Sequence, residues 1–479
     1  MTPSRPTTAR LTPQEHDVFR RYAGLSLPRH VAYPMPNWWE PLDPETADSM
    51  RSASNQGHPR DLSLYVHIPF CQALCKFCGC NKVILKKELP HAADRVEQFL
   101  AAVDRELEQL AAVVASNRTV RQVHWGGGTP TYLDVQQIER LHGAITRRFT
   151  IAADAEQAVE VDPRVTTTEQ LEQLRQLGFN RISLGVQDFD AQVQEHVRRV
   201  QPYEMVAATV DACRAAGFGS VNFDIIYGMP YQTVESVCET VERVVTLGPD
   251  RIAFYHYALV PAKIATQRGI DHTKLPSSDE KLEMFLLGRE KFTEAGYEFI
   301  GLDHFARPQE ALARSLEDGT ITRNFQGMST GRGLDLFGVG PSAISHLRDI
   351  GFLQNVVDTD TYASQMAAGR PVVWRGIELS RDDRIRQAIM EDLYATGVIE
   401  LARYEKAFEI DFDDYFRELA PGLELLAREG VIRRESGGRI ELTDPLGRIL
   451  MRNVAALFDA YLEPDAYRVG ARHEYSTNA

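Results

Sequence analysis

The hydrophobic and polar positions between residues 61 and 302 follow two alternating patterns. Short, continuous apolar runs predict strands buried on both faces, and longer segments with an apolar residue every three or four positions predict amphipathic helices. We expect strands at Leu64–Ile68, Val120–Trp125, Ala158–Val161, Arg181–Val186, Val221–Tyr227 and Arg251–Tyr257. We expect helices at Ala92–Val114, Val135–Phe149, Thr168–Leu177, Glu204–Ala216 and Val234–Leu247.

The order of these elements predicts the fold class. Strands that alternate with helices are typical of βαβ units and of a parallel sheet. Gly178 and Gly217 directly follow two of the predicted helices, where glycine commonly ends a helix. Six strands are fewer than the eight of a closed barrel, so we predict an α/β fold with a partial, open (βα)6 barrel over residues 61–302.

The segment before the barrel, residues 1–60, predicts little regular structure. It is rich in proline and carries an aromatic cluster at Tyr33, Trp38 and Trp39. We therefore expect an extended N-terminal arm that packs on the rest of the protein.

The segments after the barrel predict two further parts. Residues 303–364 contain loops rich in Gly and Arg, notably Gly327–Gly340, and we expect them to extend the barrel and to carry active-site loops. Residues 365–479 predict a mainly helical C-terminal domain. Within it, residues 423–442 follow a helix, strand, turn, strand pattern that resembles a winged helix, which we expect to be structural or to cover the substrate rather than to bind nucleic acid.

Composition and charge exclude several classes of protein. In a chain of 479 residues, 43% hydrophobic and 25% charged residues suffice for a large buried core. The net charge of −14 argues against broad binding of nucleic acid or anionic lipid, but it leaves room for a local basic pocket. The sequence shows neither a run of 18 apolar residues nor an apolar secretion signal, so we expect a cytoplasmic chain without membrane insertion. Without an exposed heptad pattern, we also expect a monomer.

The six cysteines are distributed unevenly. Four of them lie within ten residues, at Cys71, Cys75, Cys78 and Cys80. Cys213 and Cys238 stand alone in predicted helices, where a free cysteine acts as a small buried hydrophobic residue. A secreted disulfide framework would spread its cysteines along a short chain, so this pattern predicts metal chemistry instead.

The spacing Cys71-x3-Cys75-x2-Cys78 places three thiolates in one loop after the first strand. A structural zinc site normally uses two separated pairs of ligands, and no second pair is present here. Three thiolates suit three irons of a [4Fe–4S] cluster and leave the fourth iron open, so a cluster is favoured over zinc. Cys80 lies only two positions after Cys78 and cannot easily reach the same cluster, so we keep it apart as a candidate catalytic residue.

Polar residues and glycines follow the ends of the predicted strands, where such barrels hold their catalytic residues. Gly126–Gly128 would let backbone N–H groups approach a ligand closely, or they simply form a tight turn. Glu160 could hold a ribose or an ammonium group, or it is a solvated carboxylate. Asp224 lies within an apolar strand and needs a partner, which Arg199 could supply in a ligand site or in a purely structural ion pair.

The cysteine motif, with Phe77 before its last cysteine, resembles the signature of the radical S-adenosylmethionine (SAM) superfamily. Within that superfamily, Tyr65–Lys82 is similar to the oxygen-independent coproporphyrinogen III oxidases, also called coproporphyrinogen dehydrogenases, of anaerobic haem synthesis. The similarity spans about residues 20 to 460. It continues at His124–Tyr132, Glu160–Arg164, Gly178–Arg181, Gly185–Phe189, Asp224–Gly228, Asp303–Pro308, Arg323–Gly327, Trp374–Ile377 and Arg381–Asp383.

The resemblance implies a radical SAM barrel with cofactor sites on named residues. It implies a [4Fe–4S] cluster on Cys71, Cys75 and Cys78. The positions that match contacts of a cluster-bound SAM are Tyr65, Gly127, Glu160 and Ile344, although core packing is an equally simple role for Ile344. The positions that match contacts of a second SAM are Phe77, Gly128, Thr129, Gln187, Arg199, Asp224 and Ala258.

The resemblance also implies the reaction. A 5′-deoxyadenosyl radical removes a hydrogen atom from the β-carbon of a propionate, and loss of CO2 and one electron leaves a vinyl group. Two such steps convert coproporphyrinogen III to protoporphyrinogen IX in haem and porphyrin biosynthesis, with an electron donor that the sequence does not identify. The substrate has four carboxylates, and candidates for holding them are Arg29, Arg307, Arg323 and Arg332.

Two segments depart from the family pattern. Arg29-His30-Val31-Ala32 stands where the family has Arg-Tyr-Thr-Ser, and Leu259 stands where it has His. These changes leave open a radical SAM enzyme that modifies another tetrapyrrole by methyl or adenosyl transfer. A haem-trafficking binding protein is a further alternative, but Gly79-Cys80 after the third cysteine argues against it.

Overall fold

The computed structural model describes residues 10–25, 27–435 and 437–462. It divides into two compact units. The barrel unit consists of Trp38–Ile225 and Gly331–Leu379. The flanking unit consists of Met1–Asn37, Ile226–Thr330 and Ser380–Ala479.

The barrel unit is built on the predicted parallel strands. Neighbouring strands are parallel in the order β2 (Leu62–Ile68), β5 (Val120–Gly127), β6 (Ile151–Val161), β7 (Arg181–Gln187) and β8 (Ser220–Tyr227). The chain enters the flanking unit within β8, and the sixth predicted strand is present there as β9 (Arg251–His256). Because nearly all their apolar side chains are buried, these strands were visible in the sequence as continuous apolar runs.

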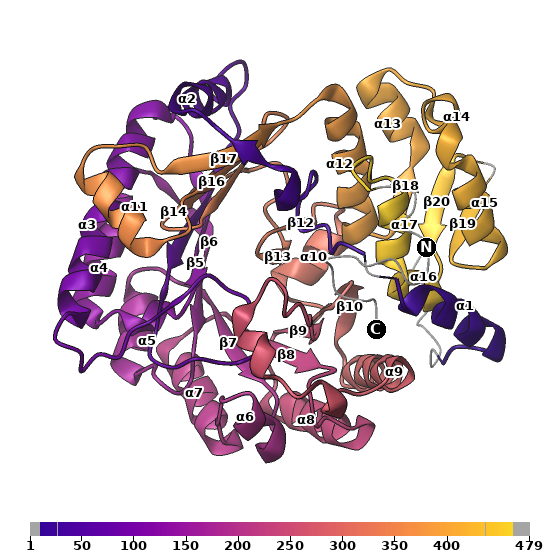
Figure 1. Ribbon diagram of the computed structural model, residues 1–479, viewed down its shortest axis with the longest axis horizontal. Helices are drawn as coiled ribbons and strands as arrows, with labels where there is room; N and C mark the ends of the chain where they lie inside the picture. Colours follow the sequence, from indigo (N-terminus) through magenta and orange to yellow (C-terminus); the bar gives the residue numbers. More distant parts are fainter. Residues whose placement is uncertain (1–9, 26, 436, 463–479) are drawn as a thin grey trace. The chain divides into compact units, whose positions relative to one another are not determined.

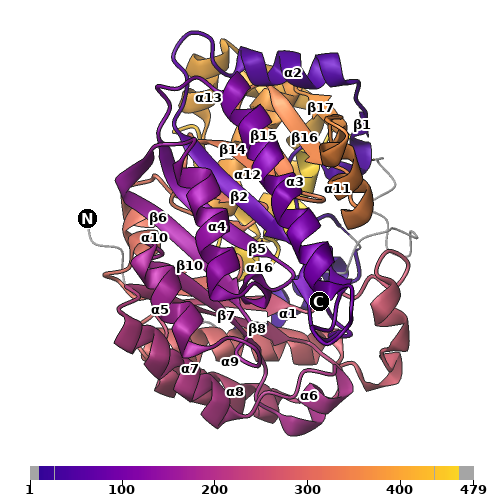
Figure 2. The same cartoon turned by 90° about the vertical axis from the view of Figure 1, so that its left-hand side faces the viewer.

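The five predicted helices alternate with these strands. They are α3 (Ala92–Val113), α4 (Val135–Thr146), α5 (Thr168–Gln176), α7 (Tyr203–Ala216) and, in the flanking unit, α8 (Val234–Leu247). The short helix α6 (Ala191–His196), which precedes α7, was not predicted. Capping boxes begin several of them; the side chain of Thr167, for example, accepts from the backbone of Gln170 at the start of α5. Figures 1 and 2 show α3 and α4 covering one face of the barrel strands.

One region of the barrel unit differs from the expectation of loops followed by helices. Strand β14 (Asp335–Val339) pairs in parallel with β2, and antiparallel strands then extend the sheet. These are β15 (Ile344–Leu347), β16 (Gly351–Asn355), β17 (Val373–Glu378) and β1 (Glu40–Pro41). A Cβ atom at Gly338 would meet the backbone of Ile344, and one at Gly351 would meet the backbone of Ile377. Glycine is required where neighbouring strands approach so closely, and these glycines made the strands resemble loops.

The expectation of an irregular N-terminal arm is wrong for much of its length. Helix α1 (Pro13–Ala23) lies in the flanking unit and α2 (Pro44–Ala53) lies in the barrel unit. Each begins with proline after a capping residue, Thr12 or Asp43, so these prolines mark helix starts rather than irregular chain. Trp39 of the aromatic cluster stacks on Phe352 at 5.2 Å between ring centroids.

The remaining elements are short. The barrel unit also contains β3 (Phe70–Cys71), β4 (Val83–Ile84) and α11 (Thr359–Ala367). The flanking unit contains α9 (Ser278–Glu294), β10 (Glu298–Gly301), β11 (His304–Ala306), α10 (Ala311–Glu317), β12 (Thr322–Asn324) and β13 (Gly327–Ser329). Single 3-10 turns lie at Pro36–Trp38, Pro130–Tyr132, Ala265–Gly269, His272–Lys274 and Arg417–Leu419.

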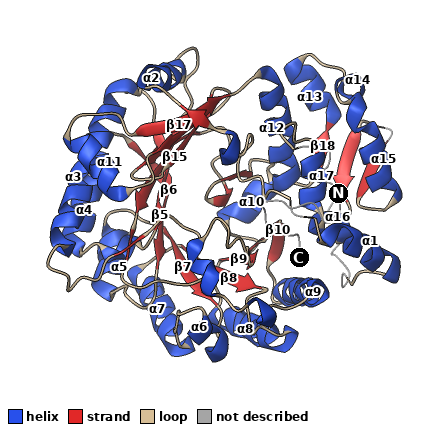
Figure 3. Ribbon diagram, in the orientation of Figure 1, coloured by secondary structure: helices blue, strands red, loops and turns tan. Residues whose placement is uncertain are grey.

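The C-terminal part of the flanking unit is mainly helical, as predicted (Figure 3). Its helices are α12 (Arg381–Ala395), α13 (Leu401–Phe408), α14 (Phe412–Tyr415), α15 (Ala420–Arg428), α16 (Leu446–Ile449) and α17 (Met451–Leu457). They pack with a small antiparallel sheet of β18 (Val398–Glu400), β20 (Arg439–Leu442) and β19 (Ile432–Glu435). The expected order of helix, strand, turn and strand is confirmed. In the described part of the chain, no helix has the length and apolarity needed to span a membrane.

Candidate active site

The cysteine loop leaves the end of β2 and is held by backbone hydrogen bonds along its length. The carbonyl of Pro69 accepts from Val83 at 2.7 Å, and the carbonyl of Cys71 accepts from Leu85 at 2.9 Å. Further along, the N–H of Lys76 donates to Val197, next to the end of α6, at 2.9 Å. The protein therefore positions the cysteines through its own backbone.

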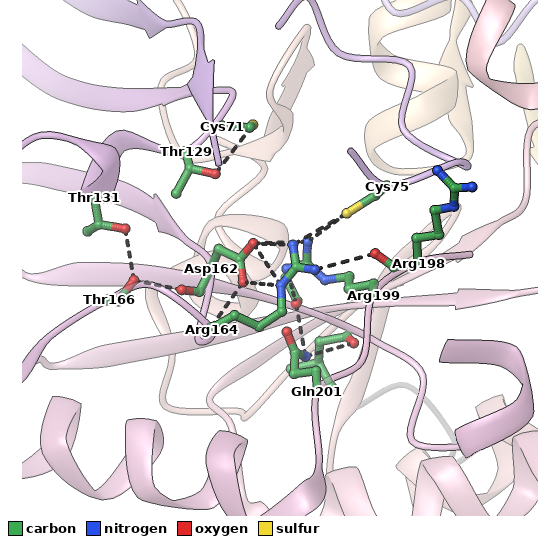
Figure 4. Close-up of polar contacts among 12 residues, drawn as sticks. Cys71, Cys75, Thr129, Thr131, Asp162, Arg164, Thr166, Arg198, Arg199 and Gln201 are labelled. Carbon is green, nitrogen blue, oxygen red and sulfur yellow. Dashed lines mark hydrogen bonds and ion pairs between the residues drawn. The ribbon is translucent and has the colours of Figure 1, made fainter. Parts of the chain in front are cut away.

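Two arginines surround the sulfur of Cys75, which is the most buried of the four loop cysteines (Figure 4). Arg164 donates to this sulfur at 3.4 Å and Arg199 donates at 3.5 Å. These two hydrogen bonds fix the position of the sulfur within the loop. On the opposite side of the loop, the sulfur of Cys71 lies 3.5 Å from the hydroxyl of Thr129.

Asp162 neutralises both arginines. Its carboxylate lies 2.6 Å from Arg164 and 3.4 Å from Arg199. Burial raises the pKa of Asp162, but the two guanidinium groups outweigh this effect and the net pKa is lowered. The sequence suggested Asp224 as the partner of Arg199; the structure instead gives Asp162. Asp224 accepts hydrogen bonds from Ser183 at 3.1 Å and Asn222 at 3.0 Å.

The three predicted ligands, Cys71, Cys75 and Cys78, lie close enough to interact electrostatically. Burial raises the pKa of Cys71 to about 11, so metal binding would release its proton. In the described residues, no three Cys, His, Asp or Glu side chains are arranged around one point as ligands of a single ion. A [4Fe–4S] cluster takes one thiolate at each of three separate irons, which agrees with three cysteines in one loop.

Cys80 contacts the third ligand. A hydrogen bond between the two sulfurs lowers the pKa of Cys78 to about 6 and raises the pKa of Cys80. Cys80 thus lies beside the cluster ligands, and its separate role stays a prediction.

Three of the four residues expected around a cluster-bound SAM converge at the ends of β2, β5 and β6. The hydroxyl of Tyr65 lies 3.0 Å from Nδ1 of His67, and the N–H of Gly127 donates to Glu160 at 3.2 Å. Nε2 of His124 lies 3.0 Å from Glu160 and its ring stacks against Tyr65. The fourth residue, Ile344, begins β15 and is half-buried.

The glycines at the end of β5 allow close packing of the backbone. Gly127 has a φ of +111°, and a Cβ atom there would lie 2.6 Å from the ring of His67. The N–H of Gly128 donates to Ile68 and that of Thr129 donates to Phe70, each at 2.8 Å. These two N–H groups are therefore used within the protein, and the contact of the glycines with a ligand stays a prediction.

The second group of expected contacts lies partly along the adjacent strands. Gln187 ends β7 with a φ of +70°, which is uncommon for a residue other than glycine and is typical of strained functional positions. Arg199 donates to the carbonyl of Gly185 at 2.6 Å, two residues before Gln187. Phe77 is half-buried in the cysteine loop, and Asp224 lies on the neighbouring strand β8. Ala258 follows β9 in the flanking unit, where its carbonyl accepts from Gln267.

The four arginines proposed for substrate carboxylates have different surroundings. Arg307 is structural, because it stacks on Tyr297 and donates to the carbonyl of Ala295. Arg29 donates to the carbonyl of His256 at 2.8 Å, and Arg323 is buried 4.0 Å from Asp303. Arg332 lies in the barrel unit and is half-buried.

Sequence reasoning did not single out four residues of this site: His67, His124, Asp162 and Arg164. His67 lies near the carboxyl end of β2, and Asp162 directly follows β6, which is the signal that could have identified these two. His124 lies within β5 and Arg164 lies three residues after β6.

The sequence model of the radical SAM superfamily matches residues 65–244. The oxygen-independent coproporphyrinogen III oxidase of Pseudomonas aeruginosa is 41% identical over 450 residues, which cover 93% of this chain and 95% of that protein. The protein of the same name from Escherichia coli is 44% identical over 407 residues, which cover 85% of this chain and 87% of that protein. The solved structure of coproporphyrinogen III oxidase from Escherichia coli, described as a radical SAM enzyme, matches with a TM-score of 0.86 at 38% identity, covering 95% of this chain and 100% of that chain.

Proposed function

The chain belongs to the family of oxygen-independent coproporphyrinogen III oxidases, and we propose that it oxidises coproporphyrinogen III anaerobically with a [4Fe–4S] cluster and SAM. The observation that carries this proposal is the extent of the similarity. A shared radical SAM barrel alone would leave the substrate open, because one fold serves many reactions. Here the similarity also includes the flanking unit, since a solved member of the family matches 95% of the chain.

The chain's own residues position the cofactors. Cys71, Cys75 and Cys78 hold the cluster, and hydrogen bonds from Arg164 and Arg199 orient the sulfur of Cys75. When bound, the cluster and SAM supply a carbon radical that abstracts a hydrogen atom. The proposal gives Tyr65, Gly127, Glu160 and Ile344 to the first SAM. It gives a second SAM to Phe77, Gly128, Thr129, Gln187, Arg199, Asp224 and Ala258.

The proposed product is protoporphyrinogen IX, formed by two oxidative decarboxylations of propionate groups. We further propose a monomer that receives electrons from a separate donor in a reducing compartment such as the cytoplasm. All six cysteines are free, which agrees with such a compartment.

The experiment is an anaerobic assay with reconstituted cluster, SAM, a reductant and coproporphyrinogen III, read by mass spectrometry. Loss of two CO2 from the substrate is the expected result. Cys75→Ala serves as the inactive control, and no mass change with the wild-type protein contradicts the proposal.

A second candidate is modification of another tetrapyrrole. It is favoured by one contact: Arg29, beside the divergent residues His30–Ala32, donates to the carbonyl of His256, which ends β9 three residues before the divergent Leu259. Gain of a methyl or adenosyl group in the same mass spectrum identifies this candidate. Retention of haem without turnover identifies a binding protein.

A further inference from the structure

The flanking unit contains a small cavity at the carboxyl ends of two barrel strands. Its volume is about 60 Å³, and its walls include Tyr227 and His256, the last residues of β8 and β9. Lys281 of α9 and Arg452 of α17 also line it, together with Arg29. Catalytic and substrate-binding groups of such barrels lie at these strand ends, so the cavity lies on the functional side of β8 and β9.

Cationic side chains outnumber anionic ones in the cavity wall. Arg29, Lys281, Arg448 and Arg452 contribute to it, whereas Asp303 is its acidic member. Two of the arginines donate to backbone carbonyls: Arg29 to His256 at 2.8 Å and Arg448 to Thr396 at 2.7 Å. A carbonyl accepts a hydrogen bond but does not neutralise a charge.

Asp303 is already engaged. Its carboxylate lies 2.6 Å from Nδ1 of His304 and 4.0 Å from Arg323. Burial raises the pKa of Asp303, but His304, Arg323 and Arg29 lower it further, so it stays ionised. Among the described residues that line the cavity, this one carboxylate faces four cationic side chains.

Buried polar atoms without partners point to a missing ligand. Among the described residues, neither ring nitrogen of His256 has a hydrogen-bond partner, although both are buried. Nε and Nη1 of Arg323, which lies beside Asp303, are likewise buried without a hydrogen-bond partner among the described residues. Such atoms are costly to bury unless a further group satisfies them. Burial and the neighbouring cations also lower the pKa of His256 well below its ordinary value and that of Arg452 to about 9, which agrees with an excess of positive charge.

We propose that this cavity binds one carboxylate of the tetrapyrrole substrate through Arg29, Lys281, His256 and Arg452, an assignment that rests on the proposed function. The size of the cavity suits a carboxylate, since about 60 Å³ is several times the minimum of about 10–15 Å³ that holds one water molecule and is far below the ~300 Å³ of a pocket for a whole small molecule. The bound propionate is one that is not being oxidised, because loss of its CO2 would leave the surrounding cations uncompensated. The cavity thus sets which propionate is presented for reaction.

The experiment measures binding to the full-length protein with reconstituted cluster. The probes are coproporphyrin III, a fluorescent oxidised analogue with four carboxylates, and its uncharged tetramethyl ester. Lys281→Met and Arg29→Gln should each weaken binding of the acid about 10- to 100-fold, as removal of one partner of a buried charge pair does, and should leave binding of the ester unchanged. KM for coproporphyrinogen III should rise by a similar factor in both variants, with kcat less affected.

Matched controls separate this effect from misfolding. Lys291→Met also lies on α9, but Lys291 forms an ion pair with Glu242 at 2.7 Å outside the cavity, so this variant should bind both probes like the wild type. Arg29→Lys keeps the charge and should restore most of the affinity that Arg29→Gln loses. If Lys281→Met does not fold, as judged by iron content and circular dichroism, Arg29→Gln and Arg29→Lys still test whether the cavity binds the carboxylate.

The remaining outcomes are also informative. Equal affinities of wild type, Lys281→Met and Arg29→Gln for coproporphyrin III overturn the assignment, as does an equal loss of affinity for the ester. A third outcome is that binding of coproporphyrin III does not depend on Lys281, while free propionate at millimolar concentration competes with it. The cavity then binds a free anion instead, and the assignment is overturned. If the wild type binds as expected but does not oxidise coproporphyrinogen III, the proposed function fails while the carboxylate site stands.

Discussion

Two buried clusters of arginine in this protein differ in what balances their charge. In the barrel unit, Arg164 and Arg199 contact the carboxylate of Asp162 and the sulfur of Cys75. In the flanking unit, Arg29 and Arg452 donate to backbone carbonyls. The carboxylate that pairs with the first cluster, Asp162, belongs to the chain itself. For the second cluster, we infer that the substrate supplies a carboxylate. The partners of a buried arginine thus distinguish a site that is already assembled from one that awaits its ligand.

The largest expected effect tests whether the sulfurs of Cys71, Cys75 and Cys78 are ligands of the cluster. Cys71→Ala, Cys75→Ala and Cys78→Ala should each abolish iron binding and SAM cleavage, because each removes one of three thiolates of the cluster. Iron and sulfide content and the amount of cleaved SAM measure the effect. Cys80→Ala should keep the cluster while slowing the substrate reaction. Cys238→Ala, in α8, should keep both the cluster and the wild-type rate. Full iron content in any of the first three variants shows that the replaced cysteine is not a ligand.

The next effect removes the carboxylate that balances the barrel cluster. Asp162→Asn leaves two buried guanidinium groups without their anion and should lower the free energy of unfolding by about 3 kcal/mol. Denaturant unfolding of the cluster-free protein measures it. The control is Asp154→Asn, whose exposed ion pair with Arg121 should contribute less than about 1 kcal/mol. Equal effects of the two variants would mean that Asp162 does not neutralise its neighbours.

A smaller effect depends on pH and concerns the flanking cluster. Burial and nearby cations lower the pKa of His256, so the folded protein keeps this imidazole neutral at a pH where the unfolded chain protonates it. The unfolded state then binds more protons, and stability falls as the pH drops below about 6.5. When the pH falls from about 7.5 to about 5.5, the free energy of unfolding should decrease by about 1 kcal/mol more in the wild type than in His256→Gln.

Denaturant unfolding at the two pH values provides the measurement. His58→Gln, at an exposed position, should keep the pH dependence of the wild type. A His256→Gln variant that loses as much stability as the wild type shows that the imidazole is not held neutral by its surroundings.

The smallest effect has the opposite sign from that of Asp162→Asn. Burial lowers the pKa of Lys281, so the charged ammonium destabilises the ligand-free protein. Lys281→Met should raise the free energy of unfolding by about 0.5 kcal/mol while weakening substrate binding, a trade-off common at binding sites. Thermal unfolding without substrate measures the change. A clear loss of stability would show that Lys281 has a partner within the chain, and the contrast between the clusters would disappear.

The sequence predicted the parallel strands well because each is a continuous apolar run. It missed β15, β16 and β17, in which Gly351 and Gly376 meet backbone atoms of neighbouring strands. Local patterns reveal burial of side chains, but they do not reveal where two backbones approach each other. Prolines misled in the N-terminal segment for a related reason, since proline begins a helix as readily as it interrupts one.

In the candidate site, too, the sequence reveals local patterns but not the contacts between distant residues. The spacing of Cys71, Cys75 and Cys78 predicted the cluster loop, because all three predicted ligands are close in sequence. Arg164 and Arg199 are 89 and 124 residues from Cys75, and only the convergence of β6 and α6 on the loop brings them to its sulfur. Asp162 directly follows β6 and Asp224 lies within β8, so the sequence could not decide which of them faces Arg199.

The two-residue strand β1 has a consequence for self-association. Glu40 and Pro41 pair with Gly376 and Arg375 of β17 at one end of the large sheet, and both are exposed. Without them, β17 would present its unpaired backbone groups as a template for strands of other molecules. Pro41 has no N–H to offer a further strand, and the charge of Glu40 disfavours close stacking. A short piece of chain before the barrel thus protects this edge of a long sheet from aggregation.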